Sequence, residues 1–112
     1  MSQITTHILD TTQGKPAAGV IIILLEQRNG GWQKIATGQT NSDGRIPDLL
    51  PPEEVLPTGI YKLKFETKPY FDSLGIKSFY PFVEVVFELN DLAHYHVPLL
   101  LNPYGYSTYK GS

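Results

Sequence analysis

The chain has 112 residues, of which 41% are hydrophobic and 18% are charged, and its formal net charge is −2. A chain of this length can bury one hydrophobic core without a disulfide or a metal, so residues 1–112 are predicted to form a single domain. The near-neutral charge without a basic cluster argues against nucleic-acid binding through phosphate contacts, and the lack of cysteine excludes thiol nucleophiles and cysteine-ligated metal sites.

Short segments rich in Val, Ile, Leu, Tyr and Phe alternate with glycine, proline and Asp-Gly or Asn-Asp turns along the whole chain. This pattern predicts an all-β domain whose strands pair antiparallel, because most connections are too short for a crossover helix. In chain order, the predicted strands are residues 4–10, 20–28, 32–40, 45–47, 59–67, 82–88, 94–101 and 106–110. Residues 68–75 are the exception, since Tyr70, Phe71 and Leu74 have helical spacing and predict one short helix.

The sequence has no pattern of membrane insertion or export. Its first seven residues lack the basic and apolar regions of a signal peptide, and the longest apolar stretch, residues 19–25, is far too short to cross a bilayer. We therefore expect a cytoplasmic protein that does not bind a membrane.

Alternation with a period of two separates two faces on the predicted strands 4–10 and 94–101. The face expected to join the core carries Ile4, Thr6, Ile8, Asp10, Tyr95, Val97, Leu99 and Leu101. The opposite face carries Thr5, His7, Leu9, His94, His96, Pro98 and Leu100. Because this outer face mixes histidine with apolar residues and has no charged side chain, we expect self-association to cover it. Pro98 cannot donate a hydrogen bond to a neighbouring strand, and it predicts an irregularity beside His96.

His7 and His96 are the candidate catalytic groups of this face. An imidazole with its ordinary pKa of about 6.5 can accept a proton from water at neutral pH, whereas a structural hydrogen bond is the alternative role. The three histidines also permit a zinc site with an open position, with Asp10 or Asp91 as outer partners. The residues alone leave both the metal-free site and the zinc-assisted site open.

Arg45 directly follows the turn predicted at residues 41–44. At the start of a strand its planar guanidinium is suited to hold a carboxylate or a urea-like group. The alternative is an exposed ion pair with Asp43 or Asp48.

Three segments of the chain carry a family resemblance. They are Thr6-His7-Ile8-Leu9-Asp10 followed by residues 14–20, Thr40-Asn41-Ser42-Asp43-Gly44-Arg45, and residues 94–109 followed by Gly111-Ser112. These segments resemble the signatures of the transthyretin-like family, and more narrowly of its enzyme branch, the 5-hydroxyisourate hydrolases of urate breakdown. The resemblance covers the whole chain, and the segments occur in the family's order.

The resemblance implies a fold, an assembly and an activity. The fold is a transthyretin-like, eight-stranded antiparallel β-sandwich with one short helix. The assembly is a homotetramer, a dimer of dimers with active sites along a central channel. The activity is metal-free hydrolysis of a cyclic amide in 5-hydroxyisourate, which opens its six-membered ring to 2-oxo-4-hydroxy-4-carboxy-5-ureidoimidazoline and requires no cofactor.

The resemblance also implies roles for individual residues. His7, Arg45 and His96 match catalytic and substrate-binding positions, and Tyr109 and Ser112 match further substrate-binding positions. Supporting positions on the channel wall are His94, Leu9, Pro98, Leu100 and Ser107. Lys110 departs from the family's arginine, so the planar fork is absent there although the charge is kept. The alternative function is a transthyretin-like carrier that binds a small molecule in the central channel.

Overall fold

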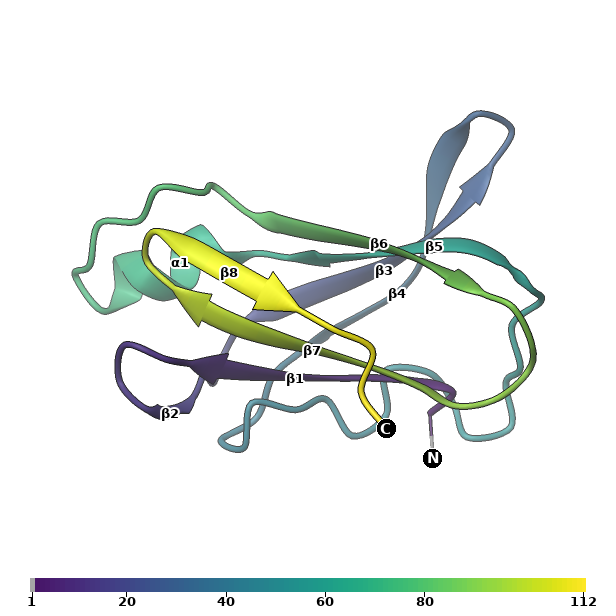
Figure 1. Ribbon diagram of the computed structural model, residues 1–112, viewed down its shortest axis with the longest axis horizontal. Coiled ribbons are helices and arrows are strands. Elements are labelled where there is room, and N and C mark those ends of the chain that lie inside the picture. The colour runs from purple at the N-terminus through teal and green to yellow at the C-terminus, as the bar shows by residue number, and fades with distance from the viewer. Residues whose placement is uncertain (1) are drawn as a thin grey trace.

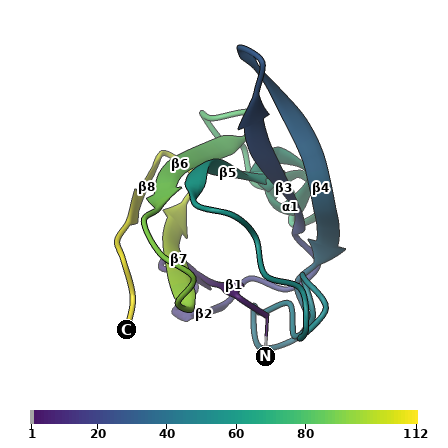
Figure 2. The ribbon, with the colours of Figure 1, turned by 90° about the vertical axis from the view of Figure 1, so that its right-hand side faces the viewer.

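Eight strands and one helix form a sandwich of two four-stranded sheets, as described for residues 2–112 by a computed structural model (Figure 1). In chain order the elements are β1 (Ile4–Asp10), β2 (Lys15–Pro16), β3 (Ile21–Arg28), β4 (Gly31–Gln39), β5 (Gly59–Phe65), α1 (Thr67–Ser73), β6 (Val83–Leu89), β7 (Tyr95–Asn102) and β8 (Gly105–Thr108). One sheet has the order β2-β1-β7-β8 and the other β4-β3-β5-β6. Viewed end on, the two sheets enclose the interior (Figure 2).

The predicted all-β sandwich with one short helix is confirmed, and two local predictions need correction. The predicted strand 45–47 is reduced to a single bridge between Arg45 and His7, because Pro47, Pro51 and Pro52 leave the following segment without the N–H groups that a strand needs. The two-residue strand β2 was not predicted from the sequence. The helix α1 lies within one to two residues of its predicted limits and is followed by Gly75 at a φ of 70°.

The pairing of the strands is antiparallel with one exception among the described residues. β1 pairs with β7 in parallel, which corrects the antiparallel expectation for this pair. The expectation rested on short connections, whereas the whole second sheet lies between β1 and β7 in the sequence. The parallel register places Thr5 beside His96, His7 beside Pro98 and Leu9 beside Leu100.

The core lies between the two sheets and follows the predicted alternation. Along β1, the inward-facing residues are buried and the outward-facing residues are half-buried, and β7 also buries its predicted inner set. Fully buried side chains from both sheets and α1 include Ile4, Ile8, Leu24, Leu63, Phe65, Phe71 and Leu99. Burial of one such side chain stabilises the fold by about 1.5–3 kcal/mol.

Asp10 is a buried carboxylate that ties the end of β1 to the helix. It accepts hydrogen bonds from the Tyr70 hydroxyl at 2.8 Å, from the side chain of Gln13 at 2.9 Å and from the backbone N–H groups of Thr12 and Gln13. Burial, followed by the hydrogen bond to Asp10, raises the pKa of Tyr70. Because these donors satisfy the carboxylate, we assign Asp10 a structural role in closing this end of the sandwich.

The ladder of hydrogen bonds between β7 and β8 is interrupted at Pro98, which agrees with the irregularity predicted from this proline. Leu99 pairs with Thr108 at the end of β8, and pairing resumes between His96 and Gly111 in the same register. Tyr109 and Lys110 lie outside any strand between these two pairs. The chain end therefore returns to β7 next to His96. In residues 2–112, no helix is long and apolar enough to span a membrane.

Candidate active site

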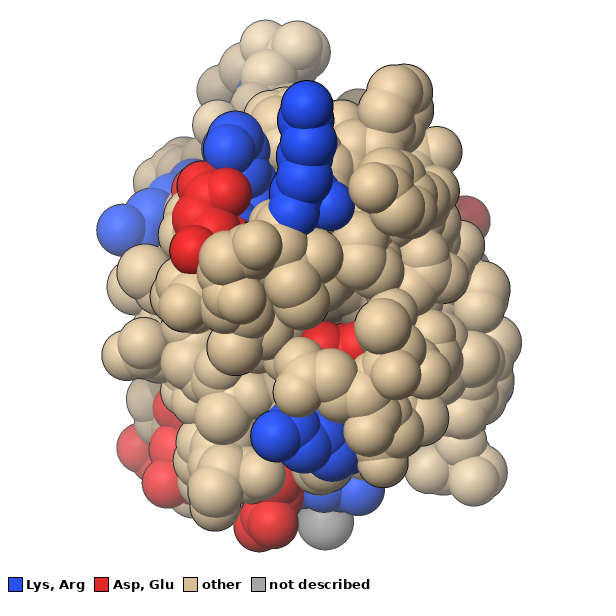
Figure 3. Space-filling view, turned by 90° about the vertical axis from the view of Figure 1, so that its left-hand side faces the viewer, with Lys and Arg blue, Asp and Glu red and all other residues tan. Residues whose placement is uncertain are grey.

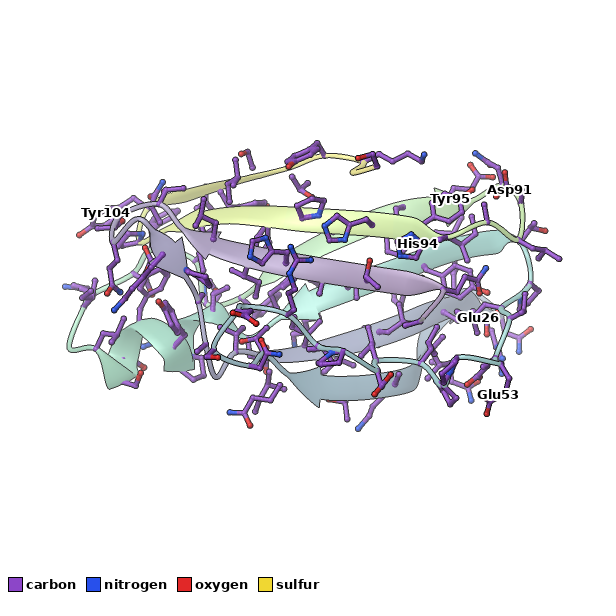
Figure 4. All side chains as sticks on the ribbon, turned by 90° about the horizontal axis from the view of Figure 1, so that it is seen from below. Glu26, Glu53, Asp91, His94, Tyr95 and Tyr104 are labelled. Carbon is purple, nitrogen blue, oxygen red and sulfur yellow. The ribbon has the colours of Figure 1, made fainter. Side chains whose placement is uncertain are left out.

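The outer face of β1 and β7 carries its polar side chains in rows that the strand register defines. One row contains Thr5, His96 and Gly111, and the next contains His7 and Pro98. Seen from this side of the sheet, His94 lies on the same outer face, at the start of β7 (Figure 4). His7 and His96 are half-buried there, whereas His94 is exposed. The predicted sharing of one face by the three histidines is confirmed.

The turn at residues 41–44 places Arg45 against β1. The side-chain oxygen of Asn41 accepts hydrogen bonds from the N–H groups of Asp43 and Arg45, and the carbonyl of Gly44 accepts from the N–H of Ile8 at 2.9 Å. Gly44 has a φ of 72°, which favours glycine, and a Cβ atom here would lie 2.5 Å from the Ile8 carbonyl oxygen. Only a residue without a side chain fits this close approach, and the next residue, Arg45, then bridges to His7.

The guanidinium of Arg45 acts electrostatically on both half-buried histidines. Burial is the largest cause that lowers the pKa of His7, and the charge of Arg45 adds to it, while the backbone and carboxylate of Asp43 oppose the shift. Burial likewise lowers the pKa of His96, followed by the electrostatic effects of Arg45, His94 and His7, while a hydrogen bond to the Thr5 backbone opposes the shift. Both rings are therefore held in the neutral form at neutral pH, in which one nitrogen can accept a proton.

Arg45 itself makes no ion pair within residues 2–112, so the alternative of a salt bridge with Asp43 or Asp48 is not observed in the protomer. Its five donor groups are thus available to a ligand. No group of three histidine or carboxylate side chains in the described part of the chain is arranged to hold a metal ion. The outer partners considered for zinc are engaged elsewhere, because Asp10 binds Tyr70 and Asp91 accepts from the Tyr95 hydroxyl at 3.0 Å.

The C-terminal residues pack directly on His96. The N–H of Gly111 donates to the carbonyl of His96 at 2.8 Å, and a Cβ atom on Gly111 would lie 2.6 Å from the ring carbon Cδ2 of His96. The missing side chain therefore lets the backbone lie against the imidazole and limits where the ring can turn. Ser112 follows and lines the same pocket as His96.

An open pocket of about 520 Å³ is lined by four of the ten predicted site residues, Arg45, His94, His96 and Ser112. Its lining comes from β1, from the turn that carries Arg45, from the start of β7 and from the chain end: Thr5, Thr6, Asn41, Asp43, Arg45, Ile46, Pro47, His94, His96 and Ser112. His7 does not line this pocket, but it is bridged to Arg45, which does. The structure thus brings Arg45, His94, His96 and Ser112 together in one hollow, with His7 bridged to Arg45.

The remaining predicted residues lie farther along the sheet or on another side. Leu9, Leu100 and Ser107 form one row across β1, β7 and β8, next to the row of His7 and Pro98. Tyr109 lines a different hollow, between β6 and the chain end, and is 57% exposed in the protomer. Its substrate-binding role stays a prediction.

The sequence did not single out Thr5, which the structure places between two histidines. The Thr5 hydroxyl lies 2.9 Å from Nε2 of His94 and 2.8 Å from Nδ1 of His96. Alternation did place Thr5 on the histidine face, but only the register of the parallel pair β1–β7 puts it next to His96. Gly44 and Gly111 were likewise not recognised as residues that shape the site.

Two kinds of protein are similar to this chain, 5-hydroxyisourate hydrolases and a transthyretin. A probable 5-hydroxyisourate hydrolase of Schizosaccharomyces pombe is 49% identical, and the match covers 97% of this chain and 90% of that protein. A 5-hydroxyisourate hydrolase of Mus musculus is 48% identical, and the match covers 99% of this chain and 96% of that protein. The structure of Klebsiella pneumoniae 5-hydroxyisourate hydrolase matches with a TM-score of 0.84 and 38% identity over 97% of this chain and 92% of that one. Sea bream transthyretin in complex with thyroxine matches with a TM-score of 0.90 and 35% identity over 97% and 94%.

A family model connects these observations. The model of the HIUase/Transthyretin family matches residues 4–111, which span the two sheets, the turn with Arg45 and the end of the chain up to Gly111. With residues 4–111 matched by the family model and with relatives that are 48–49% identical over at least 90% of their length, the chain belongs to the HIUase/Transthyretin family.

Proposed function

We propose that this protein hydrolyses 5-hydroxyisourate, opening its six-membered ring to 2-oxo-4-hydroxy-4-carboxy-5-ureidoimidazoline. The observation that carries the proposal is the convergence of His96 and Arg45 in one pocket, with His7 bridged to Arg45, in a chain whose relatives are named 5-hydroxyisourate hydrolases. The substrate is a product of urate oxidation, so the protein acts in urate degradation. The lack of cysteine suits a reducing compartment, and the cytoplasm is its proposed location.

The reaction requires a base, a group that stabilises negative charge and a means to hold the ring. A neutral imidazole, His7 or His96, accepts the proton of a water that attacks the carbonyl carbon of the cyclic amide. Arg45 donates hydrogen bonds to the oxygen that becomes negative in the tetrahedral intermediate, in a half-enclosed site where such donors act more strongly than in water. Ser112, through its hydroxyl or its terminal carboxylate, positions the water or the substrate. The proton that the imidazole has taken up is passed to the nitrogen that leaves when the ring C–N bond breaks.

The proposed working form is a homotetramer. β6 and β8 are edge strands of their sheets and border a second hollow of about 520 Å³. Near β8, the end of the molecule with α1 and the β7–β8 hairpin has a broad uncharged surface (Figure 3), with exposed Phe79, Tyr80, Tyr104 and Tyr106. Unpaired edges and exposed aromatic side chains favour contacts between subunits. A neighbouring subunit over the outer face of β1 and β7 would close the open pocket.

The function is tested by generating 5-hydroxyisourate from urate in situ and following its ultraviolet absorbance with and without the protein. We expect His96→Asn to lower kcat/KM by about a hundredfold, because it removes a proton-accepting ring. Asparagine is chosen because its amide can keep a hydrogen bond to Thr5, so the strand pairing should be unaffected. Circular dichroism and size-exclusion measurements on the same samples report the fold and the assembly.

Two results would contradict the proposal. Decay of 5-hydroxyisourate at the uncatalysed rate in the presence of folded wild-type protein would exclude the activity, and tight binding of an aromatic ligand by that protein would then favour a carrier. Activity of His96→Asn close to that of wild type would exclude the assigned role of this histidine.

The pH dependence of the reaction follows from the lowered pKa of both rings. The ordinary pKa is 6.5, so rings with a lower pKa are more than half neutral at pH 6.5 and reach half protonation only in more acidic solution. We expect kcat/KM to be level above neutral pH and to fall in acid with a midpoint below pH 6.5. A profile of kcat/KM from about pH 8 to about pH 5 measures this, and a midpoint above 6.5 would contradict the expected environment of the rings.

The free energy of unfolding should also decrease as the pH falls below 6.5. Below pH 6.5 the unfolded chain binds protons at these histidines before the folded chain does, so the folded state loses stability as the pH falls through that window. The contribution is fully present above 6.5, and urea unfolding at several pH values reports it.

A further inference from the structure

His94 is joined to His96 by a single hydroxyl group. Nε2 of His94 lies 2.9 Å from Oγ1 of Thr5, and the same oxygen lies 2.8 Å from Nδ1 of His96. Backbone pairing fixes the positions of these residues. Thr5 and His96 are paired in the parallel ladder of β1 and β7, and His94 directly precedes β7. The result is a continuous chain of hydrogen bonds from an exposed ring to a half-buried ring.

The Thr5 hydroxyl links the protonation of the two rings because it has one proton. When it donates to Nε2 of His94, it can only accept from His96, whose Nδ1 must then carry a hydrogen. When it donates to Nδ1 of His96, that nitrogen must be bare and the proton of the neutral ring lies on Nε2. The direction of the chain of hydrogen bonds therefore decides whether Nε2 of His96 is a bare acceptor or carries the hydrogen of the neutral ring.

His96 needs a bare Nε2 to accept a proton from water. Its Nδ1 lies 2.8 Å from the Thr5 hydroxyl, so Nε2 is the ring nitrogen left for water or substrate. Gly111 lies against the neighbouring ring carbon and restricts rotation of the ring. Only the chain that runs from His96 through Thr5 to His94 gives the ring the required form.

We propose that His94 is a positioning residue for the hydrolysis: through the Thr5 hydroxyl it accepts the hydrogen-bond chain that keeps Nε2 of His96 bare, and it takes the proton displaced when Nε2 is protonated. This inference rests on the proposed function. In the step, a water proton binds Nε2 of His96, the Nδ1 proton moves to Oγ1 of Thr5, and the hydroxyl proton moves to Nε2 of His94. His96 ends neutral with a hydrogen on Nε2, ready for the leaving nitrogen, and the positive charge lies on the exposed His94.

Several other charged groups face His96 and belong in the account of its titration. They are Arg45 from the turn and the titratable rings of His7 from β1 and of His94 from the start of β7, all of which lower its pKa, whereas a hydrogen bond to the Thr5 backbone raises it. Asp43 lines the same pocket. Removal of the ring of His94 takes away one of these causes. The acid limb of the pH profile, which is the range over which kcat/KM falls as the pH decreases, should then move to higher pH.

Three conservative substitutions test the proposal kinetically. Thr5→Val keeps the shape of the side chain but removes the hydroxyl, and we expect kcat to fall about tenfold with less than a twofold change of KM. Thr5→Ser should restore most of kcat because it restores the hydroxyl. His94→Gln keeps a hydrogen-bonding group close to the position of Nε2 of His94, but the glutamine side chain takes up no proton. We expect kcat to fall about tenfold, as in Thr5→Val, and the acid limb of the pH profile to shift to higher pH. Thr37→Val is the matched control and should behave as wild type, because it removes a hydroxyl on β4 that donates to the backbone carbonyl of Ile22 on β3.

A spectroscopic measurement separates this inference from the proposed function. Nitrogen chemical shifts of the imidazole rings in ¹⁵N-labelled protein identify which ring nitrogen carries the hydrogen, and comparison with His96→Asn assigns the signals of His96. We expect His96 with its hydrogen on Nδ1 in wild type and a mixture of both forms in Thr5→Val. Hydrogen on Nε2 in wild type, or an unchanged His96 in Thr5→Val, overturns the inference even if the enzyme is active, whereas the expected spectra in a protein that does not hydrolyse 5-hydroxyisourate would overturn only the function.

Discussion

Arg45→Ala is expected to lower kcat/KM for 5-hydroxyisourate about a thousandfold, the largest loss among the single site substitutions. The guanidinium has no ion-pair partner within residues 2–112, so its donors are free to bind the developing oxyanion. Its charge also lowers the pKa of His7 and His96, and its removal should raise both. The variant should therefore be slow at every pH, with its acid limb moved to higher pH.

Two further variants separate the charge of Arg45 from its shape. Arg45→Lys keeps the positive charge, so the acid limb should return toward its wild-type position, while most of the rate loss should remain because the planar fork is absent. Arg28→Ala is the matched control, since Arg28 pairs with Glu26 on the β3–β4 hairpin and does not line the pocket. Full activity of Arg45→Ala, or a loss of equal size in Arg28→Ala, would contradict the role assigned to Arg45.

The faces of the strands could be predicted from the sequence because alternation is a local property. It placed Thr5 and His7 on one face of β1 and His96 on the matching face of β7, and the chemistry of Asp43-Gly44 predicted the turn before Arg45. These predictions need only neighbouring residues. They hold because each strand lies half in the core and half outside it.

The contacts between distant segments could not be predicted in the same way. The parallel register of β1 with β7 decides that Thr5, and not His7, lies beside His96, and no local pattern encodes it. The return of Gly111 to His96 follows the antiparallel register of β7 with β8, and the hydrogen-bond chain through Thr5 depends on the parallel register of β1 with β7. The family resemblance supplied the identity of the site residues, whereas their relative placement required the fold.

Gly44→Ala is expected to damage both the fold and the site. The substitution forces an L-residue to a φ of 72° and places a methyl group 2.5 Å from the Ile8 carbonyl oxygen and 3.0 Å from Cβ of Pro16. We expect a loss of about 3 kcal/mol in the free energy of unfolding, from backbone strain and overpacking together. The turn must also move away from β1, so Arg45 leaves its place beside His7 and kcat/KM should fall by about a hundredfold or more.

Gly14→Ala provides a matched control for the strain alone. Gly14 has a φ of 69°, but nothing lies within 4 Å of the position of its added Cβ atom. It should therefore lose roughly 1–2 kcal/mol of stability from the left-handed backbone and keep its full kcat/KM. Urea unfolding gives the first quantity, and the absorbance assay at a temperature where both variants are fully folded gives the second.

The comparison of the two alanine variants decides whether the position of Arg45, and not stability in general, limits the rate. If stability were the cause, both variants would show the same kcat/KM once corrected for the folded fraction. A hundredfold difference between folded Gly44→Ala and folded Gly14→Ala instead attributes the loss to the displaced turn, since backbone strain is common to both. Equal kcat/KM for the two folded variants would mean that Arg45 reaches the reacting atoms without the close contact between Gly44 and β1, and that its bridge to His7 is not needed for the reaction.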